Sequence, residues 1–252
     1  MIIIMKVLLL NGSPRKEGCT YTALTEVANT LKKNGIEAEI FQAGDPSREN
    51  VTAAAEKMKE ADALVVGSPV YWASPSGQIM EFMDKFASMA GKYMVHKPAA
   101  AVASARRAGT TATLDVLTKY FTYHQMPVVS GNYWTMVHGN TPDEVHKDEE
   151  GLQIMRTLGN NMTWLLKCIE AGKNAGINAP ETEEKIKTNL SDSFIGRLFS
   201  LIIVVYSVAK IHRSLRCIIF HLYFQRGPIT FYNYDTSNIY TAIILIPSPV
   251  PP

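Results

Sequence analysis

The stretch MIIIMKVLLLNGSPRKEGCT, residues 1–20, decides the fold of this chain. It begins with a short apolar run of Ile, Val and Leu, which is typical of a strand buried on both faces of a sheet. A loop rich in Gly, Ser and Pro follows, and apolar residues at helical spacing begin near Tyr21. The stretch therefore predicts a strand, a tight loop and the start of a helix.

The same alternation continues along the chain. We expect strands at 2–10, 36–41, 61–67, 99–103 and 127–131, and helices at 21–34, 51–60, 76–89, 111–123 and 143–171. Strands separated by helices favour right-handed crossovers and a buried parallel sheet. We predict an α/β fold, a doubly wound five-stranded parallel sheet with helices on both faces.

Composition divides the chain into two parts. All 15 Glu and all 11 Met precede residue 190, whereas the segment after it carries five basic and two acidic residues. One continuous domain rarely changes its residue usage so sharply, so we predict a domain at 1–189 and an atypical hydrophobic and basic tail at 190–252. The formal net charge of +2 is too small to indicate nucleic-acid binding.

Three interpretations of the tail remain open. It is an interfacial helix on an anionic membrane, a loosely packed or disordered extension, or non-native translated sequence. Its apolar stretch at 198–209 is shorter than the ~20 residues that span a bilayer. The lack of Glu and Met and the terminal IPSPVPP favour the last two interpretations over membrane contact.

Cysteine usage and the N-terminus favour the cytoplasm. Cys19, Cys168 and Cys217 are odd in number and widely spaced, which excludes a disulfide framework and a four-cysteine cluster. The apolar run at 2–10 has no basic segment before it and no small-residue cleavage site after it. We therefore expect no export signal and a reducing compartment.

Chemistry is expected at the carboxyl ends of the strands, where such sheets bind ligands. Four distinctive loops follow predicted strands there, at 11–20, 68–76, 104–111 and 132–139. The first has the composition of an anion site, because a helix start offers free N–H groups, Ser13 and Thr20 add hydroxyls, and Arg15 and Lys16 add charge. It matches neither the Walker A spacing nor G-x-G-x-x-G. The alternative is an ordinary turn with Thr20 as the helix N-cap.

These loops resemble the NADPH-dependent FMN reductase family of the flavodoxin-like superfamily. G-S-P-R-K-x-G-x-T at 12–20 looks like its phosphate loop, with Cys19 where many relatives have Asn. G-S-P-V-Y-W at 67–72, followed by F-M-D-K at 82–85, is similar to two further family segments. The third loop resembles the family's R-x-G-G stretch, with Thr110 in place of the second Gly. The resemblance spans about residues 5–189.

The resemblance implies a fold, a cofactor and an activity. The implied strand order is 2-1-3-4-5, and the implied enzyme passes a hydride from NADPH or NADH through N5 of noncovalent FMN to a quinone, azo or nitro compound. The implied FMN-binding residues are Ser13, Arg15, Lys16, Gly18, Cys19, Thr20, Pro69, Val70, Tyr71, Trp72, Ser104, Arg106, Ala108 and Gly109. No catalytic side chain is needed, because the flavin carries the chemistry.

Several residues keep a structural alternative. Tyr71 and Trp72 are core aromatics in the alternative interpretation, and Arg107 is interpreted as part of a solvated turn. Cys19 lies at a helix start, where a thiol pKa can fall, but a small filler is the favoured interpretation. No histidine is assigned a catalytic role, and His124, His138 and His146 form no metal-binding pattern.

The resemblance also implies an oligomeric state, and two other functions remain as alternatives. The family implies a homodimer or homotetramer, with contact surface from Trp134 and from a helix that carries Met80, Met83 and Met89, unless those Met side chains fill the core. A flavodoxin-like electron carrier with a protein partner is the main alternative, and a flavin-free scaffold is a third. Iron–sulfur flavoproteins, a sister group, carry a cysteine cluster after the second strand. This chain has no cysteine between Cys19 and Cys168, so we expect no such cluster and no metal.

Overall fold

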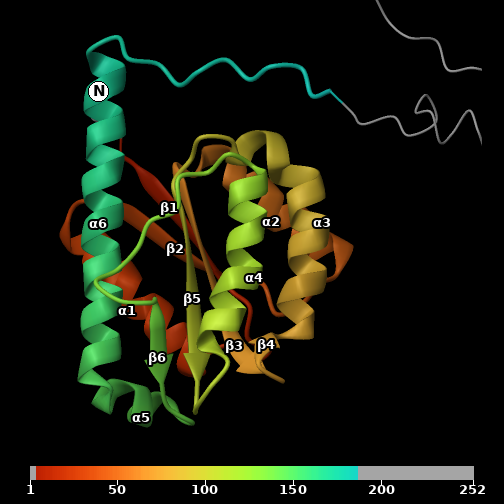
Figure 1. Cartoon of the computed structure of the whole chain (residues 1–252), viewed down its shortest axis with the longest axis vertical. Coiled ribbons are helices and arrows are strands. Elements are labelled where there is room, and N and C mark those ends of the chain that lie inside the picture. The colour runs from red at the N-terminus through yellow and green to blue at the C-terminus, as the bar shows by residue number, and fades with distance from the viewer. Residues whose placement is uncertain (1–3, 187–252) are drawn as a thin grey trace, which may run out of the picture. The chain divides into compact units, whose positions relative to one another are not determined.

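The computed structural model describes residues 4–186, which contain one sheet with helices on both of its faces (Figure 1). The strand order is β2-β1-β3-β5-β6, these strands all run parallel, and the short β4 pairs antiparallel with β3. The strands are β1 (Lys6–Asn11), β2 (Glu37–Gln42), β3 (Ala63–Tyr71), β4 (Ser74–Pro75), β5 (Ala99–Ala105) and β6 (Met136–His138). Since β5 and β6 are the fourth and fifth parallel strands, the predicted order 2-1-3-4-5 is confirmed.

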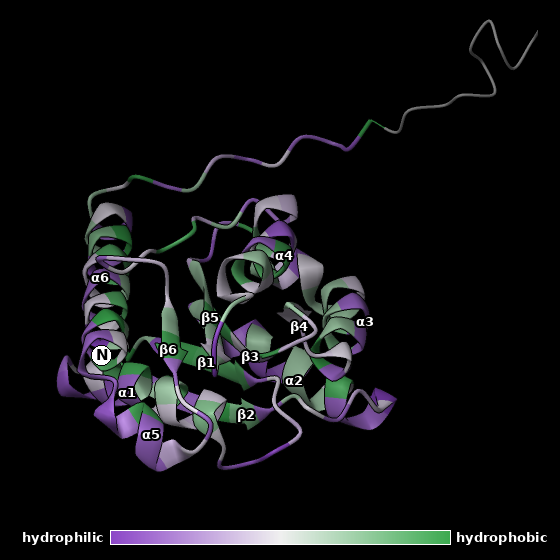
Figure 2. Ribbon diagram, turned by 60° about the horizontal axis from the view of Figure 1, so that its bottom comes forward, coloured by the Kyte–Doolittle hydropathy of each residue, from purple (hydrophilic) through white to green (hydrophobic). Residues whose placement is uncertain are grey.

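Two hydrophobic cores separate the sheet from its helical layers. The helices are α1 (Cys19–Lys33), α2 (Arg48–Glu60), α3 (Gly77–Met94), α4 (Thr110–Tyr123), α5 (Pro142–Lys147) and α6 (Glu149–Asn174). Val7 and Leu9 of β1 pack with α1, α5 and α6, whereas Leu8 and Leu10 pack with α2, α3 and α4. This alternation along one strand makes both faces of the sheet apolar, as the green strands of Figure 2 show.

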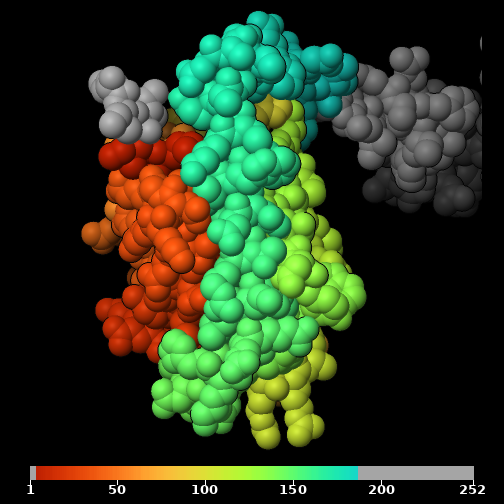
Figure 3. Space-filling view, turned by 90° about the vertical axis from the view of Figure 1, so that its left-hand side faces the viewer, coloured from red at the N-terminus to blue at the C-terminus, as the bar shows by residue number. Residues whose placement is uncertain are grey.

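Helix α6 lies along α1 and closes one side of the molecule (Figure 3). Gly159 permits this close approach, because a Cβ atom there would lie 2.8 Å from Cβ of Thr30 in α1. Arg156 Nη1 also contacts Glu26 Oε1 at 2.7 Å across the same interface. These contacts hold α1, the helix that follows the first loop, against α6.

The fifth strand was predicted in the wrong place. The chain at 127–131 makes only a single bridge, between Val128 and Ala99, and the strand itself is β6. Ala103 lies four positions after Ala99 along β5, whereas their partners Val128 and Met136 lie eight positions apart. The second segment therefore has four extra residues, which loop out. An edge strand tolerates such an insertion because only one of its sides is paired.

Three smaller differences concern element boundaries. The first strand begins at Lys6, and the part of its predicted range at 1–3 lies outside the described residues. The predicted helix at 143–171 is two helices that break at Asp148, whose side chain accepts a 2.9 Å hydrogen bond from the backbone N–H of Gly151. The hairpin that β3 forms with β4 was not predicted.

The tail prediction lies outside the described residues. The compact unit that contains the sheet extends to Glu181. In the range 4–186, no helix combines the length and the apolar character that crossing a membrane requires.

Candidate functional site

The first and second loops are tied together at the carboxyl edge of the sheet. The backbone N–H of Gly12 donates to the carbonyl of Gly67 at 2.8 Å, and Ser76 Oγ donates to the carbonyl of Gly12 at 2.9 Å. A Cβ atom at Gly12 would lie 2.6 Å from Cβ of Ile79, so only glycine fits between the loops. The two loops therefore form one rigid surface.

Asn11 organises the first loop from below, and sequence reasoning missed it. Its buried Nδ2 donates to the carbonyl of Lys16 at 3.1 Å and to Oε1 of Gln42 at 2.8 Å, while its Oδ1 accepts from the N–H of Ser13 at 3.2 Å. Ser13 Oγ in turn accepts from the N–H of Arg15 at 3.1 Å. The available signal was an Asn at the end of a strand that is otherwise apolar.

Two helices at this edge begin without a protein cap. Gly18 at the start of α1 and Gly109 at the start of α4 supply no side-chain hydrogen bond, and neither helix has an acidic residue in its first turn. The other helices are capped by side chains, namely Ser47, Ser76, Thr141 and Asp148. The uncapped helices follow β1 and β5, so their free N–H groups face the loops that the sequence singled out.

Thr20 joins the first loop to the third and is not the N-cap of α1. Its Oγ1 lies 2.7 Å from Oγ of Ser104, and both residues are almost fully buried. The methyl group of Thr20 also packs against Gly67, because a Cβ atom added at Gly67 would lie only 2.9 Å from that methyl group. The assignment of Thr20 as the N-cap in the alternative interpretation is therefore wrong, because Gly18 occupies the cap position.

The second loop is a β-hairpin whose tip adopts an uncommon conformation. Tyr71 pairs with Ser74, and the two residues between them, Trp72 and Ala73, have φ angles of 53° and 58°. Left-handed angles at both central positions define a type I′ turn, which normally selects Asn and Gly. Trp72 is fully exposed and Tyr71 is partly exposed, so the interpretation of both as core aromatics is wrong.

The third loop packs directly against this hairpin. Gly109 has a φ angle of 103°, and a Cβ atom there would lie 2.7 Å from Cα of Ala73 and 2.8 Å from Cγ1 of Val70. Pro69 pairs with Ser104 in the sheet below. Residues 69–73 and 104–109 therefore form one continuous wall beside the first loop.

Cations at this edge have no acidic partner. Arg15, Lys16, Arg106 and Arg107 are all exposed. In residues 4–186, none of the four takes part in an ion pair. Together with the open starts of α1 and α4, they make the edge a surface suited to anions.

The fourth loop differs from the predicted one. Because β6 spans 136–138, the chain that leaves its carboxyl end begins at Gly139, whose carbonyl lies 3.6 Å from Sγ of Cys19. Burial raises the pKa of the Cys19 thiol despite the opposing effects of a backbone hydrogen bond and of Arg15. Tyr133 and Trp134 lie before β6, where their rings pack edge to face at 4.8 Å and both side chains are exposed.

The residues present fit FMN. A phosphate needs N–H donors and a cation, and the start of α1 with Arg15 offers both. Among the described residues Arg15 takes part in no ion pair, although the exposed Glu17 lies in the same loop. A flat ring needs a wall with backbone donors, which 69–73 and 104–109 offer. Residues 4–186 contain no group of three metal-ligating side chains.

Comparisons with known proteins agree with this geometry. Residues 5–141 match the family model described as NADPH-dependent FMN reductase. An iron–sulfur flavoprotein of Methanocaldococcus jannaschii is 30% identical over 192 residues, which covers 66% of this chain and 100% of the relative. Two solved structures share the fold at lower identity. FerB of Paracoccus denitrificans, a flavoenzyme NAD(P)H:(acceptor) oxidoreductase, has a TM-score of 0.51 at 16% identity and covers 66% of this chain and 98% of its own. The NAD(P)H:quinone oxidoreductase of Methanothermobacter marburgensis has a TM-score of 0.50 at 17% identity. The match covers 64% of this chain and 96% of that protein.

The iron–sulfur cluster in the relative's name does not fit this chain. A cubane cluster is held by four cysteine thiolates, and the whole sequence has three cysteines. The two described cysteines also lie at opposite edges of the sheet. Cys19 contacts Gly139 beyond β6, whereas Cys168 lines a cleft with Met5, which precedes β1. The segment between β2 and α2 is short and contains no cysteine.

The match to the family model covers more than half of the chain, and the relative is matched over its full length. The three loops that gave the resemblance, after β1, β3 and β5, lie along one edge of the sheet, where a flavin and a nucleotide bind in folds of this type. The chain therefore belongs to the NADPH-dependent FMN reductase family and is an oxidoreductase that uses FMN with NAD(P)H.

Proposed function

We propose that this protein is an NAD(P)H oxidoreductase that delivers two electrons directly to a small acceptor such as a quinone, azo or nitro compound. The observation that carries the proposal is the pair of uncapped helix starts at α1 and α4, which flank an exposed hairpin wall at one edge of the sheet. These features supply an anion site and a ring site side by side.

Each loop has a separate role in binding the cofactor. The phosphate binds at 13–20, where Arg15 and Lys16 neutralise its charge and the N–H groups of Gly18, Cys19 and Thr20 donate to it. The ring lies against the backbone of 69–72, with Tyr71 beside it. Arg106, Ala108 and Gly109 contact its pyrimidine edge, where N–H donors and a cation stabilise the negative charge of the reduced ring. Ser104, buried against Thr20, supports this loop from beneath.

The protein positions the reactants and does not supply an acid or a base. The residues at 13–20, 69–72 and 104–109 would hold FMN, which would supply hydride transfer through its N5 from NAD(P)H to the acceptor, with a proton from solvent. The first and second loops hold their relative positions through Gly12, Gly67 and Ser76. We propose that one ring face stays open beside them. Nucleotide and acceptor use this face in turn, which predicts ping-pong kinetics.

The cysteine count favours a small-molecule acceptor over electron transfer to a protein partner. A chain with a cluster can send electrons singly to a distant partner, but this chain cannot hold four cysteine ligands. The near-neutral balance of 1–189 also lacks the strong negative charge with which true flavodoxins meet their partners. The two described cysteines are free thiols, and we propose a reducing, cytoplasmic location.

The direct test is to purify the full chain and to record its visible spectrum. We expect a yellow protein that bleaches on anaerobic addition of NADPH and regains its colour with a quinone, with parallel lines in double-reciprocal plots. A colourless protein that does not take up added FMN would contradict the proposal. Reduction that is reversed only by a protein oxidant would favour the electron carrier.

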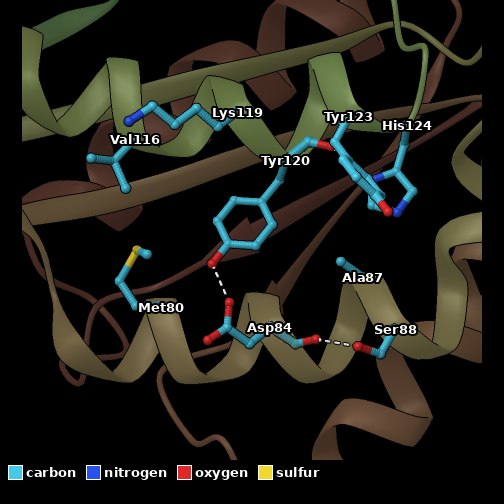
Figure 4. Close-up of a pocket in the computed structure, with 9 residues that line it drawn as sticks. All are labelled: Met80, Asp84, Ala87, Ser88, Val116, Lys119, Tyr120, Tyr123 and His124. Carbon is cyan, nitrogen blue, oxygen red and sulfur yellow. Dashed lines mark hydrogen bonds between the residues drawn. The ribbon is translucent and has the colours of Figure 1, made fainter. Parts of the chain in front are cut away.

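We further propose that two copies associate through the groove between α3 and α4 (Figure 4). This groove of about 760 Å³ is lined mainly by apolar and aromatic side chains, including Met80, Val116 and Tyr120. Met83, in contrast, is fully buried in the core. Asp84 and Lys119 also line the groove, so a twofold axis can place each carboxylate of one copy opposite an ammonium group of the other.

Tyr120 gives this groove a fixed shape. Its hydroxyl donates to Asp84 Oδ1 across the gap between the helices, as Figure 4 shows. Burial and the bond to Asp84 raise the pKa of the Tyr120 phenol, so the phenol stays neutral at physiological pH.

Val116→Glu should convert the dimer to a monomer in sedimentation velocity, whereas Thr122→Glu, on the same helix but outside the groove, should not. A wild-type monomer at micromolar concentration would exclude the groove as an interface.

A further inference from the structure

The hairpin tip and the third loop leave two side chains that the proposed cofactor site does not use. Trp72 is fully exposed, so its indole packs on no other part of the described chain. Its φ angle of 53° places this bulky residue in the left-handed region, which large side chains rarely adopt and which here belongs to the type I′ turn. The turn thus holds an aromatic ring out from the edge of the sheet.

Arg107 is the second unassigned side chain. It is exposed, and no carboxylate among the described residues pairs with it. No acidic residue occurs at 68–76 or at 104–111, so neither loop offers it a partner in sequence. Contact of Gly109 with Ala73 and Val70 joins the loop of Arg107 to the turn of Trp72.

We propose that Trp72 and Arg107 bind the adenosine 2′-phosphate half of NADPH. This inference rests on the proposed function, because it assumes that the nucleotide approaches the open ring face beside the hairpin. An indole in solvent offers a face for stacking on adenine. The guanidinium fork of Arg107 matches a phosphate dianion in bidentate geometry.

A contact between Arg107 and the 2′-phosphate should make the enzyme selective for NADPH over NADH. The two nucleotides differ only in the 2′-phosphate, so Arg107 discriminates between them, whereas Trp72 serves both. An exposed cation–phosphate contact is screened by salt, so the preference should shrink as ionic strength rises. Arg106, next in sequence, remains with the cofactor ring in the proposed site.

The first experiment compares nucleotide kinetics in the FMN-loaded full chain. Arg107→Ala should raise the ratio of KM for NADPH to KM for NADH roughly tenfold, about the factor that one charge-assisted contact supplies. Arg107→Lys, which keeps the charge but not the fork, should give an intermediate ratio. Lys167→Ala, at an exposed position on α6, is the matched control and should not change the ratio.

The second experiment measures binding without turnover. Adenosine 2′,5′-bisphosphate should quench tryptophan fluorescence and bind more tightly than adenosine 5′-monophosphate, and Arg107→Ala should abolish that difference. Trp72→Phe should remove the quenching but retain calorimetric binding, whereas Trp72→Ala should weaken binding. Trp134→Phe, at the other exposed aromatic loop, should keep the quenching and serves as the control.

The outcomes separate this proposal from the proposed function. Equal effects of Arg107→Ala on both nucleotides, or a wild-type preference for NADH, would overturn the assignment of Arg107 while leaving the oxidoreductase intact. Quenching that persists in Trp72→Phe would overturn the assignment of Trp72. If the full chain oxidises neither nucleotide but still binds the bisphosphate through Arg107, the proposed function fails and this site stands.

Discussion

The hydroxyl groups of Thr20 and Ser104 lie 2.7 Å apart and are buried between the start of α1 and the end of β5. These residues are 84 positions apart in sequence, and their contact joins the first loop to the third. One hydrogen bond thereby couples the two halves of the proposed FMN site.

Thr20→Val and Ser104→Ala should each weaken FMN binding, and their effects should not add. Removing one partner leaves the other hydroxyl buried without a hydrogen bond, which costs ~1–3 kcal/mol. The double variant removes both polar groups, so its affinity for FMN should be no lower than that of whichever single variant binds FMN less tightly. Fluorescence titration of apoprotein with FMN measures all three dissociation constants, and strict additivity would show that the pair does not couple.

Arg15→Ala should weaken FMN binding about tenfold or more. The side chain is exposed and has no acidic partner among the described residues, so its charge is available to a phosphate at the open start of α1. A charge-assisted hydrogen bond of ~1.5–3 kcal/mol corresponds to at least this factor. Lys33→Ala, in the last turn of the same helix, is the control. An unchanged FMN affinity in Arg15→Ala would place the phosphate elsewhere.

Gly109→Ala should destabilise the protein and weaken FMN binding. At a φ of 103° an alanine is strained, and its Cβ would lie 2.7 Å from Cα of Ala73. We expect a loss of ~1–3 kcal/mol in unfolding free energy, measured in urea. The control is Gly77→Ala in the first turn of α3, where nothing lies within 4 Å of the added Cβ and a neutral or stabilising effect is expected.

Cys19 should react slowly with iodoacetamide. Burial raises its pKa, so the thiolate fraction at pH 8 is lower than that of an ordinary thiol, and the rate should rise only at higher pH. The more exposed Cys168 should alkylate first. Mass spectrometry of the chain against pH, with Cys168→Ser and Cys217→Ser as controls, follows each site. Rapid labelling of Cys19 at neutral pH would contradict its burial beside Gly139.

A chain that ends at Asn189 should bind FMN and oxidise NADPH about as well as the full chain. Every loop of the proposed site lies before α5, and so does every strand that the structure describes in residues 4–186. Loss of the apolar stretch at 198–209 should also improve solubility. Size-exclusion chromatography and an NADPH oxidation assay compare the two chains. A colourless or insoluble shorter chain would mean that the boundary at 189 is misplaced.

The sequence by itself determined the βα alternation, the strand order through its family resemblance, and the positions of the first three of the four loops at which chemistry is expected. Local signals were enough there, because buried parallel strands are short apolar runs and phosphate loops need a particular set of small and basic residues. The tertiary structure alone showed that Thr20 bonds Ser104, that Asn11 supports the first loop, and that Gly109 packs on the hairpin. It also moved the fifth strand from 127–131 to β6. Both segments have strand-like composition, and only pairing with β5 decides which of them completes the sheet, because a strand is stabilised by its neighbour and not by its own residues.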